Sequence, residues 1–109
     1  MTIRMFAAID VGSFELEMGI YEISYKTGIR CVDHIRHVIA LGRDSFSQGK
    51  ISYGLVEEMC GVLSEFAQIM KTYKVKDYRA YATSALREAR NKQIILDQIR
   101  VRTGLNVRI

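Results

Sequence analysis

The sequence predicts an α/β domain in which three antiparallel strands precede a helix, a further strand and a second helical region. Three observations lead to this prediction. Residues 1–41 contain three apolar or alternating segments separated by turn residues. Residues 52–74 then change to the three- and four-residue spacing of an amphipathic helix. A short apolar segment follows, and a helical crossover before it would place it parallel to an earlier strand.

The three expected strands follow one another with short connections. Residues 6–11 form the apolar run of a buried strand, and Gly12 permits a tight turn directly after it. Residues 16–24 predict the second strand, and a Thr27-Gly28 turn leads to a third strand over residues 31–41. Because the connections are short, we expect an antiparallel meander.

The middle of the chain is expected to form a loop and then a long helix. Residues 42–49 contain Asp, two Ser and two Gly, so they are interpreted as a polar loop. Ser52 is a suitable N-cap for the helix, and Lys71 suits its C-terminal end. The apolar face of this helix consists of Leu55, Val56, Met59, Leu63, Phe66, Met70 and Tyr73.

The last third of the chain continues with a strand, two helical segments and the start of another strand. Residues 78–82 predict the strand, and Thr83 or Ser84 opens a short helix after it. Asn91 can cap a further helix that Gly104 would terminate. Residues 106–109 are expected to begin a strand.

Composition limits the classes of function. With 109 residues, 49% apolar and 26% charged, the chain fits one globular core and not a disordered segment. No apolar run approaches the ~20 residues of a membrane span. Cys31 and Cys60 lack metal-binding or C-x-x-C spacing, so we expect free thiols in an intracellular core and a cytoplasmic protein.

Charge is distributed unevenly along the chain. The net charge is +4, but residues 1–70 carry −3 and residues 71–109 carry +7. A basic half can serve a polyanionic partner or can be a set of solvated helix faces. The basic residues are scattered singly without interleaved aromatic residues, so nucleic-acid binding is not favoured.

The predicted element order β-β-β-α-β-α-β is the ribonuclease-H-like order shared by actin, Hsp70 and sugar kinases, and three segments make the resemblance more specific. Residues 6–13 (FAAIDVGS) resemble the first phosphate loop of the exopolyphosphatase/guanosine-pentaphosphate phosphohydrolase (Ppx/GppA) family, where a strand runs into D-x-G-S-N-S. Residues 82–91 (ATSALREARN) resemble the family signature A-T-S-A-[LV]-R-E-A-x-N along its whole length. Residues 40–43 and 49–52 resemble its L-G-x…G-x-[LI]-S segment.

The resemblance implies two phosphate-binding loops. In the first, Asp10 would help to hold hydrated Mg²⁺, while Gly12 and Ser13 would cradle the transferred phosphoryl group. Glycine permits close approach of phosphate, and adjacent amides form an anion-binding concavity. The implied substrates are polyphosphate or a guanosine polyphosphate such as guanosine pentaphosphate. Taken alone, Asp10 could instead cap its own turn.

In the second loop, Thr83 and Ser84 would offer hydroxyls and helix N-terminal amides to substrate phosphate. Arg87 would add a planar, bidentate donor. The alternative for Thr83 and Ser84 is simple helix capping, and for Arg87 a pair with Glu88. Asn91 is expected to cap a helix, and Glu88 and Arg90 to form a surface pair.

The chain also departs from the family pattern. Phe14, Glu15 and Glu17 replace residues of the family's N-S-x-R continuation, so two new carboxylates lie near the expected phosphate. The family's general-base glutamate, its glycine-rich second phosphate loop and its second lobe are expected beyond Ile109. We therefore predict no catalytic residue within residues 1–109 and an N-terminal phosphatase subdomain that is inactive alone. The face left by the missing lobe could drive dimerisation of this subdomain. The alternative function is a non-catalytic member that binds a phosphorylated nucleotide or a protein partner.

Overall fold

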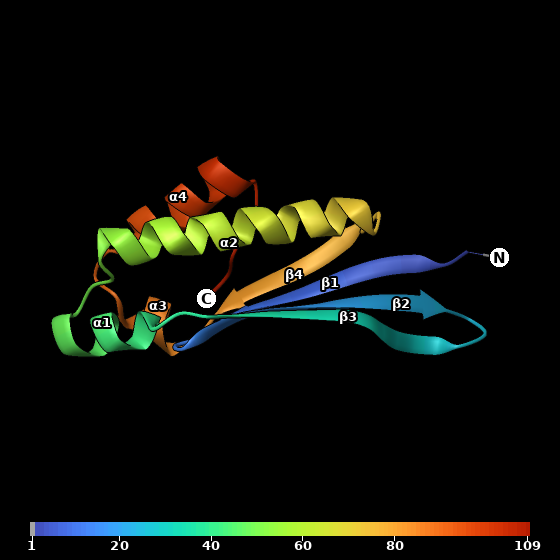
Figure 1. Cartoon of the computed structure of the whole chain (residues 1–109), viewed down its shortest axis with the longest axis horizontal. Helices are drawn as coiled ribbons and strands as arrows, with labels where there is room; N and C mark the ends of the chain where they lie inside the picture. The colour runs from blue at the N-terminus through green and yellow to red at the C-terminus, as the bar shows by residue number, and fades with distance from the viewer. Residues whose placement is uncertain (1) are drawn as a thin grey trace.

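The computed structural model describes residues 2–109 and confirms the α/β class and the order of the first three strands, the long helix and the fourth strand. The strands are β1 (Arg4–Val11), β2 (Glu15–Ser24), β3 (Gly28–Val38) and β4 (Asp77–Ala82). They form one mixed sheet with the spatial order β3-β2-β1-β4 (Figure 1). The first three strands are antiparallel, whereas β4 pairs with β1 in parallel, as predicted for a strand that follows a helical crossover.

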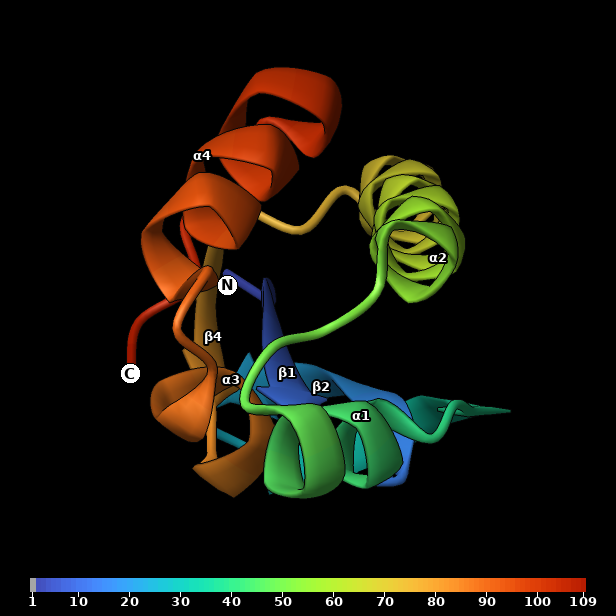
Figure 2. The same ribbon diagram turned by 90° about the vertical axis from the view of Figure 1, so that its left-hand side faces the viewer.

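The helices occupy two different positions around this sheet. The long helix α2 (Tyr53–Thr72) lies along one face, with α4 (Lys92–Thr103) beside it. The short helices α1 (Leu41–Gln48) and α3 (Ser84–Glu88) lie together at the end of the sheet where β1 and β4 terminate (Figure 2). The turn between β2 and β3 projects at the opposite end, which gives the molecule extents of 51 × 22 × 19 Å.

Alternation along β1 divides its side chains between two environments. Ala7, Ile9 and Val11 are buried in the core beneath the helices, whereas Ala8 and Asp10 are exposed on the other face of the sheet. The core contains side chains from both layers: Leu16, Met18, Ile20, Met59, Leu63, Phe66, Ile95 and Ile99. The sheet therefore presents one buried face and one open face, and Asp10 belongs to the open one.

The prediction of a polar loop over residues 42–49 was wrong, because most of this segment forms α1. Tertiary contacts outweigh its weak helix formers. Ser45 is buried, and its hydroxyl donates to the Ala85 carbonyl of α3 at 2.6 Å. The helix ends at Gly49, which has the left-handed φ of 77° that favours glycine at this position.

The ends of the other helices agree with their predicted caps only in part. Ser52 and Asn91 occupy the N-cap positions of α2 and α4, but neither side chain makes a capping hydrogen bond. Gly104 ends α4 in the left-handed conformation, as predicted. In place of the expected strand over residues 106–109, Arg108 forms a single parallel bridge with Tyr81.

Two further expectations concern cysteines and membranes. Cys60 is buried, but Cys31 is exposed on β3, so only one of the two free thiols lies in the core. Burial raises the pKa of the Cys60 thiol above its ordinary value. Within residues 2–109, no helix combines the length and the apolar character that a bilayer crossing requires.

Candidate functional site

The two loops singled out by the sequence lie side by side at one end of the sheet. They follow β1 and β4, which are neighbouring parallel strands with Val11 and Ala82 in register. The Thr83 amide donates to the Val11 carbonyl at 3.1 Å and so joins the start of the second loop to the start of the first. Ligands of α/β proteins commonly bind beyond the carboxyl ends of parallel strands, so the position suits a binding site.

The backbone of the first loop is held by its carbonyl groups. The Gly12 amide donates to the Glu15 carbonyl at 3.0 Å, which closes the turn. The carbonyls of Ser13 and Phe14 accept from the amides of Gly42 (2.7 Å) and Ile39 (3.0 Å). Within residues 2–109, the amides of Ser13 and Phe14 themselves have no acceptor. Such neighbouring free amides are the donors that an anion requires.

Glycine suits position 12 because the space around its Cα atom is limited. A Cβ atom there would lie 3.1 Å from the Glu15 carbonyl oxygen and 3.8 Å from the Asp10 carboxylate. The turn is thus tight enough that a side chain would push against its own backbone.

Asp10 lies on the open face, directly across from Glu17 of β2 and beside Tyr81 of β4. It borders a small hollow whose other charged or titratable lining groups are Glu17, Tyr21 and His34. Among residues 2–109, no group of three or more His, Cys, Asp or Glu side chains could hold a metal by itself. Mg²⁺ is often bound through one or two carboxylates together with water and substrate phosphate, and the exposed Asp10 fits that mode.

The acidic departures from the family pattern are paired within the sheet. The Glu15 carboxylate accepts from Arg36 of β3, with the closest nitrogen at 2.8 Å. Glu17 lies 3.1 Å from the Nε2 atom of His34. A side-chain hydrogen bond with Glu17 lowers the pKa of Glu15, and the nearby Arg36 guanidinium lowers it further. The expected repulsion of phosphate by Glu15 is therefore reduced by a cation that the sequence analysis did not connect with it.

The register between β2 and β3 is the signal that could have revealed these pairs. Glu17 is directly opposite Arg36, and Gly19 is directly opposite His34. The observed contacts are the diagonal ones, from Glu15 to Arg36 and from Glu17 to His34. His37 faces the helix side, where its Nε2 atom lies 2.7 Å from Glu58 of α2. The two histidines thus point to opposite faces of the sheet.

The second loop places its polar groups around the start of α3. Thr83 is the N-cap residue, but its hydroxyl makes no capping hydrogen bond. The Arg87 guanidinium lies 3.4 Å from the Ser84 hydroxyl and 3.5 Å from the Glu88 carboxylate. Both distances are at the upper limit of a hydrogen bond. The Arg87 side chain is 54% exposed. These long contacts leave its guanidinium available to an external anion.

The end of the signature segment has a structural role. The Arg90 amide donates to the Gly49 carbonyl at 2.8 Å. The Asn91 side chain donates to the Ile51 carbonyl at 2.9 Å and accepts from the Ile51 amide at 3.2 Å. Asn91 therefore fastens the α1–α2 connection instead of capping α4 through its side chain. The predicted Glu88–Arg90 pair is not observed, since Glu88 contacts Arg87.

This mixed sheet, with polar loops at the ends of β1 and β4, defines an α/β lobe of the ribonuclease-H-like, actin-like ATPase class. Residues 20–109 match the model of the Ppx/GppA phosphatase family, and the chain belongs to that family. The matched region contains the second loop, whereas Asp10 to Phe14 precede it. The fold and the family predicted from the sequence are thus confirmed.

Individual relatives agree with this assignment. Exopolyphosphatase 1 of Mycobacterium tuberculosis is 25% identical over 99 residues, which are 91% of this chain and 29% of that protein. Its counterpart in Mycobacterium leprae is 33% identical over 63 residues, or 58% of this chain and 19% of the relative. The chain therefore spans less than a third of the length of the curated relatives it matches.

Solved structures agree closely in fold. The Aquifex aeolicus member of the Ppx/GppA family superimposes with a TM-score of 0.93 and 28% identity, over 99% of this chain and 35% of that one. An exopolyphosphatase from Cytophaga hutchinsonii has a TM-score of 0.91 at 23% identity, over 97% of this chain and 34% of that one. The second similarity concerns the fold alone.

Proposed function

We propose that these 109 residues are the first lobe of a phosphohydrolase that cleaves terminal phosphoanhydride bonds of polyphosphate or guanosine pentaphosphate. One observation carries the proposal. A first loop with unpaired backbone amides and a second loop with an available arginine meet at the ends of β1 and β4, in a chain of the Ppx/GppA family. The exopolyphosphatase names of the curated relatives support polyphosphate as one substrate.

Each loop would have its own task. The amides of Ser13 and Phe14 would bind oxygens of the transferred phosphoryl group, and Gly12 would allow its approach. Arg87, with the Thr83 and Ser84 hydroxyls, would hold further phosphates of the substrate. Asp10 would position Mg²⁺, which when bound supplies positive charge that stabilises the phosphoryl oxygens.

The lobe alone should not turn over substrate. Phosphoryl transfer depends on positioning and on electrostatic stabilisation from several sides, and no general base is assigned within residues 2–109. The test is phosphate release from polyphosphate by this chain and by a longer protein that contains it. We expect release only by the longer protein, and its loss in the Asp10→Asn variant. An inactive longer protein would contradict the enzyme proposal, and an active 109-residue chain would contradict the one-lobe proposal.

The second candidate function is phosphate binding without catalysis. Phe14 motivates it, because a ring replaces an amide side chain that could donate to phosphate. Calorimetry with guanosine tetraphosphate and polyphosphate, with and without Mg²⁺, separates the two candidates. Tight binding by a longer protein that releases no phosphate would favour the binding function.

Two further proposals concern the state of the protein. The open face of the sheet, where Phe6, Tyr21, Ile23 and Ile29 lie together, could pair two copies of the chain. A mass from light scattering tests this, and a strictly monomeric mass would contradict it. We also propose a cytoplasmic location, where Cys31 and Cys60 would remain reduced.

A further inference from the structure

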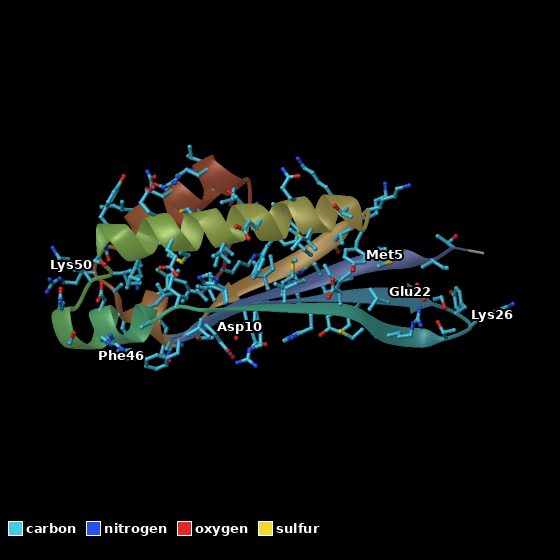
Figure 3. The ribbon with its side chains drawn as sticks, viewed as in Figure 1. Met5, Asp10, Glu22, Lys26, Phe46 and Lys50 are labelled. Carbon is cyan, nitrogen blue, oxygen red and sulfur yellow. The ribbon has the colours of Figure 1, made fainter. Side chains whose placement is uncertain are left out.

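Two phenylalanine rings are exposed beside the first loop. Phe14 is 58% exposed and Phe46 of α1 is 56% exposed. A methyl group placed on Gly42 would lie 3.0 Å from a Phe46 ring carbon and 3.3 Å from the Phe14 ring. The two rings therefore approach one point, one from the loop and the other from the helix. Asp10 and Phe46 lie on the same side and at the same end of the molecule (Figure 3).

The aromatic pair is continuous with the proposed phosphate site. The same virtual methyl group would lie 3.0 Å from the Ser13 Cβ atom, so Ser13 adjoins both rings. Phe14 contributes a free backbone amide and a ring at once. Hydrogen bonds from Ile39 and Gly42 hold the carbonyls of this segment, which fixes the backbone that carries the Phe14 ring.

Neither ring is needed for the core, because both remain more than half exposed. Adjacent exposed aromatic side chains beside polar donors are typical of a binding surface. Phenyl rings stack on planar groups of a ligand, whereas an inorganic phosphate chain offers them nothing to contact. The chemistry of the pair thus points to a ligand that joins a planar ring to a chain of phosphates.

We propose that Phe14 and Phe46 form a stacking site for the base of a nucleoside polyphosphate whose phosphates occupy the first loop. This inference rests on the proposed function and narrows it, because a ring-bearing ligand would be preferred over inorganic polyphosphate. Stacking tolerates any base, so the pair selects for a base and not for guanine in particular.

The test compares ligands that share three phosphates and differ in the base. Dissociation constants of the 109-residue chain are measured by calorimetry for GTP, ATP and tripolyphosphate, with Mg²⁺ present. We expect GTP and ATP to bind about tenfold more tightly than tripolyphosphate. Phe46→Leu should remove most of that difference and leave tripolyphosphate binding unchanged. Phe14→Leu should also remove most of the difference. The control is Tyr25→Leu, an aromatic residue that is 99% exposed in the distant β2–β3 turn.

The outcomes separate the inference from the proposal on which it rests. Equal affinity for all three ligands, unaffected by the leucine variants, would overturn the stacking site and leave the phosphate site intact. A loss of tripolyphosphate binding in Phe46→Leu, with unchanged circular dichroism, would show that the ring supports the loop and would also overturn the stacking site. Absence of binding by all three ligands would overturn the phosphate site and the stacking site together.

Discussion

The Gly42 amide donates to the Ser13 carbonyl at 2.7 Å, and the missing side chain of Gly42 lets Ser13 lie directly against α1. This contact ties the first loop to the helix that the sequence analysis interpreted as a loop. A Cβ atom at position 42 would lie only 3.0 Å from the Ser13 Cβ atom. The position of Ser13 therefore depends on a glycine far from it in the sequence.

The first prediction concerns this glycine. Gly42→Ala should weaken tripolyphosphate binding about tenfold, the equivalent of one hydrogen bond to a charged group. Overpacking costs about 1–3 kcal/mol, but alanine gains about 1 kcal/mol in a helix, so the net loss of stability should stay below about 2 kcal/mol. Calorimetry and urea denaturation measure the two effects.

A second helical glycine is the matched control. A Cβ atom on Gly61 of α2 would meet nothing within 4 Å. Gly61→Ala should therefore raise the free energy of unfolding by about 1 kcal/mol and leave binding unchanged. Equal ligand affinities for the two alanine variants would contradict the role of Gly42 in placing the loop.

Arg87 provides the second prediction. Since its contacts with Ser84 and Glu88 are long, its removal should cost binding and little stability. Arg87→Ala should weaken tripolyphosphate binding about 10- to 100-fold, and Arg87→Lys should recover only part of the loss because lysine cannot bind bidentately. Arg100→Ala is the control, because Arg100 is similarly exposed and pairs with Asp97 on α4. An equal effect of the two alanine variants would indicate general charge attraction only.

Asn91 provides the third prediction, on stability. Its side chain satisfies both backbone groups of Ile51, which is 1% exposed. Asn91→Ala leaves these groups without their partner, so the free energy of unfolding should fall by about 1–3 kcal/mol. Urea denaturation measures the loss. A change below about 0.5 kcal/mol would mean that water replaces the side chain without cost.

The fourth prediction is a pH dependence. The Ser52 amide donates to the Asp44 carboxylate at 2.8 Å, and this backbone hydrogen bond, with one from the Ser52 side chain, lowers the pKa of Asp44. A lowered folded-state pKa gives stabilisation that is present above the unfolded pKa of about 3.9 and is lost as the pH falls through the folded value. The urea midpoint of Asp44→Asn should lie below that of the natural protein at pH 7, and the gap should close below about pH 4. A gap independent of pH would exclude the charge as its cause.

The sequence predicted the strands, the long helix and the parallel β4 because each carries a local signal: an apolar run, a helical period or a glycine stop. It missed α1 because this helix depends on contacts with residues distant in the chain. Ser45 bonds to the Ala85 carbonyl, and Gly42 bonds to the Ser13 carbonyl. Asp10, Gly12, Ser13, Thr83, Ser84 and Arg87 were proposed as site residues from motifs. The partners of Glu15 and Glu17 and the neighbour of Phe14 could not be predicted, because cross-strand register and helix packing determine which of these side chains meet.

The most direct test of the central claim, that both loops bind one phosphate chain, is an amide NMR titration of the 109-residue chain with tripolyphosphate and Mg²⁺. We predict that amide resonances of residues 10–14 and 83–87 shift together and with a single dissociation constant. Shifts confined to α4, which carries Lys92, Arg100 and Arg102, or two loops that titrate with different constants, would contradict a shared phosphate site.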